Sequence, residues 1–260
     1  MSRRIYYGIC VSVCMAISLV FGLAQSTAPI TGQWTISGPI VEDRVQLSIR
    51  RYRPGSEMSS SSSVPLGQLS GLTRAQLGSS TPLVTRFDIV REAGTLRLEG
   101  YLQNGSGGGN FTFIPNPGYA NEMRSLGYSD LSDENVFRLA IHDVSTTYVR
   151  SMSAAGLRPE STEKLITMRI HGVSVEFVNE MTTMGYKELK TDKLITMRIH
   201  GVTTNFIRDI ESLGFGRPPI DKLVTMRIHG ITPDYIRKVQ ARGFNNASID
   251  QLVRLKFTAS

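Results

Sequence analysis

A repeat with a period of 29 residues runs through the C-terminal half of the chain and constrains its fold more than any other feature. The nine-residue phrase Lys164 to Gly172 returns as Lys193 to Gly201 and, with one substitution, as Lys222 to Gly230. Degenerate copies extend the array over Asn135 to Asp143 and Gln251 to Ser260. A fixed period of this length indicates one repeated supersecondary unit, because a single unit cannot bury its apolar face alone and a stack of units can.

Each unit is predicted to form two short helices. The first opens near an acidic residue, which suits the positive end of the helix dipole, and closes at the glycine after a histidine. The second starts at a hydroxyl N-cap and ends at a glycine followed by an aromatic residue, as in Gly185-Tyr186 and Gly214-Phe215. The acidic residues are Glu134, Glu163, Asp192, Asp221 and Asp250; the N-caps are Ser145, Ser174, Thr203 and Thr232, with Pro233 suited to the first helical position.

Both helices carry an apolar face that stacking is expected to bury. In one unit this face comprises Leu165, Ile166, Met168, Ile170, Val173, Phe177, Val178, Met181 and Tyr186. Residues 117–260 are therefore predicted to form a curved α-helical solenoid with its first helix packed against a preceding domain. The last copy stops after its first helix and is expected to cap the stack.

The segment from residue 32 to residue 115 carries strand signals instead. Apolar and polar residues alternate with the period of a half-buried strand, in stretches at 33–37, 44–51, 83–90, 94–102 and 110–114. One face would carry Phe87, Ile89, Leu96, Leu98, Phe111 and Phe113, and the other Arg86, Asp88, Arg97 and Glu99. We predict an antiparallel meander. The fold class is then α+β, with a small antiparallel β-domain at 25–116 followed by an α-helical hairpin-repeat solenoid.

Two polar stretches in the β-domain are interpreted as connections. Ser56 to Ser63, with five consecutive serines, is predicted to be a mobile loop because it can bury little apolar surface, and Val64 to Leu77 a short helix or irregular cover over the sheet. The glycine-rich run Asn104 to Asn110 is predicted to connect a hairpin. A phosphate loop would need a following helix N-terminus and a lysine, and here a strand follows.

The N-terminus has the pattern of a signal peptide at 1–24. A basic head with Arg3 and Arg4 precedes an apolar run, and small residues end it, so we expect cleavage after Ala24 and a periplasmic or secreted mature chain. An uncleaved membrane anchor is the alternative. Both cysteines, Cys10 and Cys14, lie in this segment. The mature chain is therefore expected to have no disulfide and no cysteine site.

The repeated histidines and arginines are the candidate ligand-facing residues. They form a possible ladder of Arg169, Arg198, Arg227, His171, His200 and His229, with His142 in a degenerate copy. Successive repeats lie about 10 Å apart, so one metal ion, whose ligands lie about 2 Å away, cannot bridge them. The histidines are expected to cap their helices, whereas the ladder either faces an anionic ligand or pairs with the repeated acidic residues of adjacent units.

The sequence carries no metalloprotease helix motif, nucleophile-elbow serine or kinase signature. The chain is therefore expected to be non-enzymatic, with no cofactor and no metal. Loss of Arg3 and Arg4 would lower the formal charge from +7 to +5, a mild excess that favours acidic partners only weakly, and no nucleic-acid partner is expected.

The phrase Lys-Leu-Ile-Thr-Met-Arg-Ile-His-Gly-Val, followed by an aromatic residue and a Gly-aromatic pair, resembles repeats of exported bacterial proteins. Similar units occur in the extracytoplasmic C-terminal region of some β-lactam-sensor-type membrane metallopeptidases and anti-sigma-linked proteins, and Phe87 to Phe113 is similar to the domain that accompanies them. The metallopeptidase domain and its zinc motif are absent from this sequence, so no protease activity carries over. The resemblance implies a bacterial extracytoplasmic accessory or sensing module.

These observations together predict an extracytoplasmic binding or interaction module. Its helical repeat surface would hold a protein, a peptide or an envelope polymer, and it would meet a membrane only through an uncleaved signal segment. A structural envelope scaffold is the alternative. A third possibility is an unrecognised hydrolase with its site at the junction of the β-domain and the repeats.

Overall fold

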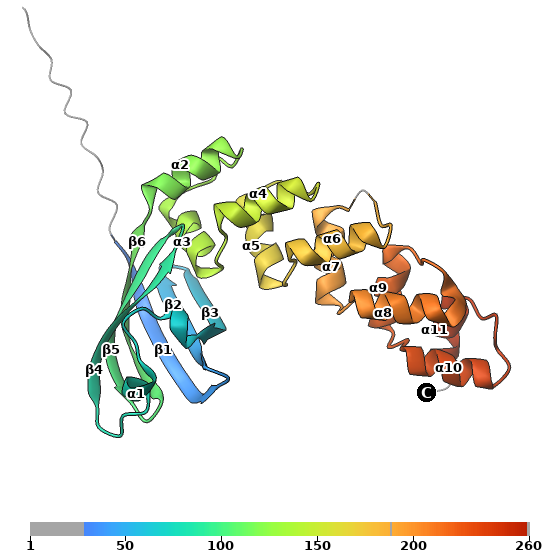
Figure 1. Ribbon diagram of the computed structural model, residues 1–260, viewed down its shortest axis with the longest axis horizontal. Helices are drawn as coiled ribbons and strands as arrows, with labels where there is room; N and C mark the ends of the chain where they lie inside the picture. The colour runs from blue at the N-terminus through green and yellow to red at the C-terminus, as the bar shows by residue number, and fades with distance from the viewer. Residues whose placement is uncertain (1–28, 188, 259–260) are drawn as a thin grey trace, which may run out of the picture.

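The computed structural model describes residues 29–187 and 189–258, apart from the side chains of residues 39 and 40. They form a mixed α+β structure in which a six-stranded antiparallel sheet is followed by a series of short helices (Figure 1). The strands are β1 (Ile30–Val41), β2 (Arg44–Arg53), β3 (Ser56–Pro65), β4 (Leu83–Arg91), β5 (Gly94–Gln103) and β6 (Ser106–Pro115). The expected signal peptide and its cleavage site lie outside the described residues.

The sheet is two three-stranded meanders joined edge to edge, and not the single meander predicted from the sequence. Its strand order is β3-β2-β1-β6-β5-β4, so the first strand pairs with the last and the edges are β3 and β4. The five pairings are antiparallel. The β1–β6 pairing joins residues about 80 positions apart in the sequence and cannot be inferred from local alternation.

The serine-rich segment is the clearest error of the sequence prediction, because it forms strand β3 and not a mobile loop. Each of its residues from Ser56 to Pro65 is paired with one residue of β2. The Ser48 and Ser61 hydroxyls lie 2.6 Å apart across this pair. An edge strand with one neighbour and a polar outer face does not need apolar alternation, since its backbone pairing and a few inward residues such as Val64 hold it in register.

The inner face of the sheet is the core of the N-terminal region, and it carries the apolar residues predicted for it. Phe87, Ile89, Leu96, Leu98, Phe111 and Phe113 are all buried. The predicted charged face is also present: Arg86 pairs with Glu99, and Arg97 with Asp88. The segment after β3 covers part of the inner face with a short 3-10 helix η1 (Leu66–Gln68) and helix α1 (Arg74–Leu77), as expected.

Glycines in β5 and β6 let these strands pack unusually closely beside Trp34. A Cβ atom at Gly109 would lie 2.0 Å from the Glu99 carbonyl oxygen, and one at Gly107 would lie 2.1 Å from that of Tyr101. The buried Trp34 ring lies at the register position of Gly109 and donates its indole N–H to the Glu99 carbonyl at 3.1 Å. The turn of this hairpin is Asn104-Gly105, so the predicted connector is confirmed, but most of the glycine-rich run belongs to the strand.

The helices begin at positions 29 residues apart in two interleaved series. One series is α2 (Pro117–Ser125), α4 (Thr146–Ala154), α6 (Val175–Thr183), α8 (Thr204–Ile210) and α10 (Pro233–Ala241); the other is α3 (Asp133–Ile141), α5 (Thr162–Ile170), α7 (Thr191–Ile199), α9 (Ile220–Ile228) and α11 (Ile249–Thr258). Helix α8 continues into a π-helical turn, η2 (Glu211–Phe215). Members of each series contact the next member of the same series, which places them in two rows (Figure 1).

The hydroxyl start signals predicted for the second helix of each unit are confirmed in the row that runs from α4 to α10. The hydroxyls of Ser145, Ser174, Thr203 and Thr232 accept hydrogen bonds from backbone N–H groups in the first turn, and Pro233 is the first residue of α10. Helices α5, α7 and α9, predicted as the first helix of their units, have their C-cap one residue before the predicted glycine: in α5 the C-cap is His171, and the next residue, Gly172, has a φ of 67°. No described helix is long and apolar enough to cross a membrane.

The sheet and the helices share one core through helix α3. This helix contacts β1, β5 and β6, and its Phe137 is fully buried. The centroid of the Phe137 ring lies 5.6 Å from that of Phe111 and 5.3 Å from that of Phe113. Beside it, Glu134 pairs with Arg51 and Arg53 of β2. The degenerate first copy is therefore the helix that covers the inner face of the sheet.

Candidate interaction surface

The repeated arginines join neighbouring repeats. Arg169, Arg198 and Arg227, here called the arginine column, each place a guanidinium over the aromatic ring of the helix before. The centroid distances are 5.1 Å to Tyr148, 5.2 Å to Phe177 and 5.0 Å to Phe206. Each Nε also donates to the backbone carbonyl of a histidine one repeat earlier, at 3.1 Å to His142, 3.3 Å to His171 and 3.2 Å to His200.

Three of the repeated acidic residues pair with lysines, whereas Glu163 pairs with Arg138, and Glu134 with Arg51 and Arg53. Within the described residues, none of these five forms an ion pair with the arginine column. Lys164 pairs with Asp192, Lys193 with Asp221, and Lys222 with Asp250 at 2.6 Å. The hydrogen bond to Asp192 raises the pKa of Lys164, and the hydrogen bond from Lys222 lowers that of Asp250. These exposed pairs link successive repeats, and each contributes little on its own.

The repeated histidines take the C-cap position that the sequence assigned to the glycine that follows, and it is their backbone N–H groups that bond carbonyls of the last turn. His142, His171, His200 and His229 are the C-cap residues of α3, α5, α7 and α9. Burial and the nearby charge of Arg138 lower the pKa of His142, so this side chain is neutral near pH 7. Among the described residues, no three histidine, cysteine, aspartate or glutamate side chains converge as metal ligands would.

An exposed row of apolar side chains lies one residue beyond the arginine column. Ile170, Ile199 and Ile228 are 55%, 53% and 55% exposed, and Phe257 occupies the same repeat position with 64% exposure. We call these four residues the apolar column. Ile170 was expected to be buried, and that expectation is wrong: α5 packs on its neighbours through Leu165, Ile166 and Met168, which are fully buried, whereas its last residue faces outward.

The sequence contained a signal for this column that helical periodicity alone could not interpret. An isoleucine or phenylalanine recurs every 29 residues from Ile170 to Phe257, and Ile141 precedes it at the same position, partly buried. Spacing shows that the position is repeated, but only the packing of the helices shows that it is uncovered. The column is the candidate interaction surface because large apolar side chains stay exposed at one repeat position in four successive copies.

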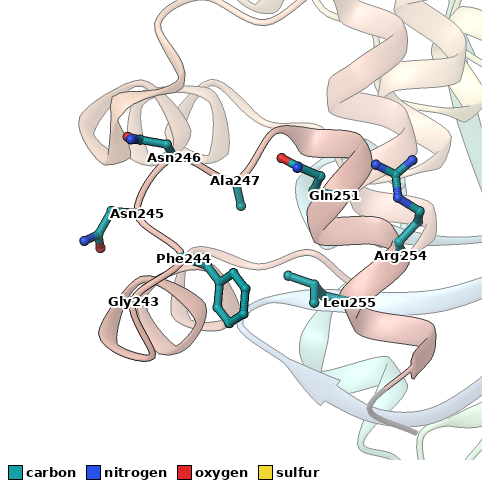
Figure 2. Close-up of a pocket in the computed structure, with 8 residues that line it drawn as sticks. All are labelled: Gly243, Phe244, Asn245, Asn246, Ala247, Gln251, Arg254 and Leu255. Atoms are coloured by element: carbon teal, nitrogen blue, oxygen red, sulfur yellow. The ribbon is translucent and has the colours of Figure 1, made fainter.

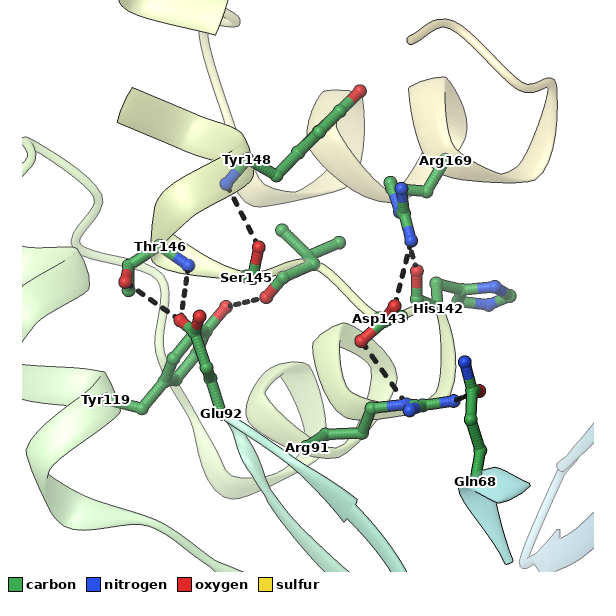
Figure 3. A network of polar contacts seen from close by, with 11 residues as sticks. Gln68, Arg91, Glu92, Tyr119, His142, Asp143, Ser145, Thr146, Tyr148 and Arg169 are labelled. Carbon is green, nitrogen blue, oxygen red and sulfur yellow. Dashed lines mark hydrogen bonds and ion pairs between the residues drawn. The ribbon is translucent and has the colours of Figure 1, made fainter. Parts of the chain in front are cut away.

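The junction between the sheet and the helices holds a polar network (Figure 3). Asp143 lies 3.3 Å from Arg91 and 3.1 Å from Arg169. The Glu92 carboxylate accepts from the Thr146 N–H at 2.7 Å and its hydroxyl at 2.8 Å, which satisfies the start of α4. Each carboxylate is therefore engaged in an ion pair or a helix cap. The network therefore holds the sheet against the first helices of the array.

A depression with a volume of about 530 Å³ lies between helix α11 and the loop that joins it to α10. Phe244, Asn245, Gln251, Arg254 and Leu255 line it, together with Gly243, Asn246 and Ala247 (Figure 2). Phe244 is 53% exposed, whereas the residues at the same position in earlier repeats, such as Tyr186, are covered by the repeat that follows. The depression is thus the open side of the last described repeat, without converging titratable groups.

Comparisons with protein-family models, curated proteins and solved structures found no match.

Proposed function

We propose that this chain is an extracytoplasmic, non-catalytic interaction module. In this proposal its helices stack as a solenoid of 29-residue hairpin repeats, and the apolar column is the surface that holds a partner. The observation that carries the proposal is the exposure, above one half, of four large apolar side chains at one repeat position. The regular helix starts and the contacts within each row of helices support the solenoid description.

A structural scaffold is the second candidate, favoured by the arginine and lysine contacts between repeats. These contacts hold the helices together and leave few of the repeated charges for a ligand. They do not account for the apolar column, since Ile170, Ile199 and Ile228 contribute little to burial. A stack that needed only cohesion would be served as well by polar residues at this position.

The sequence supports the proposed partner class and location. The signal peptide pattern supports an extracytoplasmic location, where a protein, a peptide or an envelope polymer would be the partner. The resemblance to the extracytoplasmic regions of sensor-type proteins supports the same class. Determination of the N-terminus of the chain purified from its own host should give Gln25, whereas an intact Met1 in the membrane fraction would support an uncleaved anchor.

Site-specific photo-crosslinking in intact cells tests the surface. A photoreactive residue at position 199, in the apolar column, should form a discrete adduct that weakens when Ile170 and Ile228 are both changed to Ser. The matched control is the same photoreactive residue at exposed Asn179 of α6, in the other row of helices. Equal adducts from both positions, or none from position 199, would contradict the apolar column as the binding surface and favour the scaffold.

A further inference from the structure

One member of the arginine column has a carboxylate partner that the others lack. Asp143 Oδ2 lies 3.1 Å from Arg169 Nη2. The residues at the same position in the next two repeats are Gly172 and Gly201, and in the described part of the chain neither Arg198 nor Arg227 forms an ion pair with a carboxylate. The contact of Arg169 with the repeat before it therefore includes a carboxylate, which Arg169 shares with Arg91, whereas the contacts of Arg198 and Arg227 with the repeats before them include none.

The backbone and the arginine geometry are otherwise alike where Arg169, Arg198 and Arg227 each contact the repeat before them. Asp143 has a φ of 52°, in the same left-handed region as Gly172 and Gly201, both at 67°. The guanidinium stack and the bond from Nε to the histidine carbonyl are also shared. Because Nε and the guanidinium face are occupied, the Nη groups of Arg198 and Arg227 are the donors left for another group.

Those Nη groups lie beside the glycines. A Cβ atom at Gly172 would be 3.1 Å from Nη2 of Arg198, and one at Gly201 would be 2.8 Å from Nη2 of Arg227. The contact of Arg169 shows which group fits beside such an arginine, since Asp143 places a carboxylate on the same donor, Nη2. Arg198 is half-buried and Arg227 is exposed, so a carboxylate from outside the chain has access to both.

We infer that Arg198 and Arg227 bind carboxylates of an acidic, leucine-rich or isoleucine-rich peptide segment of a partner protein, whose aliphatic side chains lie on the apolar column. This inference rests on the proposed function. Arginine and isoleucine are consecutive residues in each repeat, so a segment that reaches both positions would need carboxylates as well as aliphatic side chains. Repeats about 10 Å apart match about three residues of an extended polyproline-type chain at about 3.1 Å each.

The test uses the mature chain and a fluorescein-labelled peptide of about four such three-residue units, with Glu and Leu each at every third position. Its counterpart carries Gln in place of Glu. In the double variant Gly172→Asp, Gly201→Asp, new side chains should occupy both arginines as Asp143 occupies Arg169. We expect the Glu peptide to bind this variant at least about tenfold more weakly than the wild type by fluorescence anisotropy.

The double variant Gly172→Asn, Gly201→Asn is the matched control, because asparagine tolerates positive φ as aspartate does but adds no charge. It should bind the Glu peptide within about threefold of wild type, a difference of less than one decade in Kd. The reciprocal change Asp143→Gly should tighten binding, since it frees both Arg169 and Arg91 from the shared carboxylate. Circular dichroism and urea midpoints establish that each variant is folded.

Several results would overturn the inference. They are equal binding of the Glu peptide to the Asp and Asn variants, equal binding of the Glu and Gln peptides to wild type, and no binding of the Glu peptide to wild type. Displacement of the Glu peptide by inorganic polyphosphate at lower concentration than by unlabelled peptide would assign the arginines to a phosphate polymer instead. The proposed function fails separately, through the crosslinking at position 199.

Discussion

Arg198 shows how one side chain can serve cohesion and binding together. Its guanidinium stacks on Phe177, its Nε bonds the His171 carbonyl, and its Nη groups remain beside Gly172. Removing the arginine would therefore disturb the stack of helices as well as any ligand site. For this reason the substitutions that test binding add a carboxylate beside the arginine and leave the arginine in place.

Arg198→Gln should lower the free energy of unfolding by about 1–2 kcal/mol, through loss of the cation–π contact and of one hydrogen bond. Arg198→Lys should recover only part of this loss, because an ammonium lacks the planar group that stacks and donates at once. Urea unfolding followed by circular dichroism measures both. Arg208→Gln is the control, since Arg208 is exposed and bonds only Asn205 in its own helix. A loss as large for Arg208→Gln would contradict the assignment.

His142 should make stability depend on pH. Burial lowers its pKa in the folded chain, whereas in the unfolded chain the value is about 6.5. The unfolded state then binds more protons below that pH, so the free energy of unfolding should fall as pH decreases from 7.5 to 5.5. His142→Gln should flatten this dependence in urea titrations at both pH values. His200→Gln, at the same repeat position in α7, is the comparison, and an equal effect of both substitutions would argue against a special environment for His142.

The helices of this chain depend mainly on local sequence signals, whereas its strands depend on pairing with distant segments. The helices begin and end at local signals, such as the Ser145 hydroxyl and the glycine after each histidine. The strands depend on partners far away in the sequence, as Ser60 and its neighbours do on β2. The glycines of β6 illustrate the same dependence, because the requirement for Gly109 comes from the backbone of β5.

Gly109→Ala should destabilise the sheet by about 3 kcal/mol or more, since its Cβ atom would meet the Glu99 carbonyl and force the strands apart. The fluorescence of Trp34, the single tryptophan, reports this region directly. Gly67→Ala is the matched control because no atom lies within 4 Å of its Cβ position. If the two substitutions gave similar urea midpoints, the close packing of β5 and β6 would be in doubt.

The whole chain is connected through α3, which belongs to the repeated series by sequence and to the sheet by packing. Phe137 and Leu194 are both fully buried, but in different places. Phe137 packs on Phe111 and Phe113 of the sheet, and Leu194 lies in α7, two repeats further along. Contacts between helices run to neighbours in the same row, so a disturbance in α7 reaches the sheet only through intervening repeats.

Phe137→Ala should therefore lower the urea midpoint of Trp34 fluorescence strongly, with a loss of about 3–5 kcal/mol. Leu194→Ala should lower the free energy of unfolding by a similar amount, about 2–5 kcal/mol, when unfolding is followed by the helical signal of circular dichroism. It should shift the transition of Trp34 fluorescence much less. Identical shifts of both signals in both variants would mean that sheet and helices unfold as a single unit. No shift of Trp34 in Phe137→Ala would mean that α3 is not part of the core of the sheet.

The sequence by itself determined the features that depend on neighbouring residues: the helix starts spaced by 29, the hydroxyl N-caps, the glycines that follow the helix ends and the alternating face of Phe87 and Phe111. Only the tertiary structure decided the strand order, the pairing of the serine-rich strand, the outward position of Ile170 and the partners of Arg198. The reason is physical. Caps and periodicity act within a few residues, whereas burial and ion pairing are set by which distant segments the folded chain brings into contact.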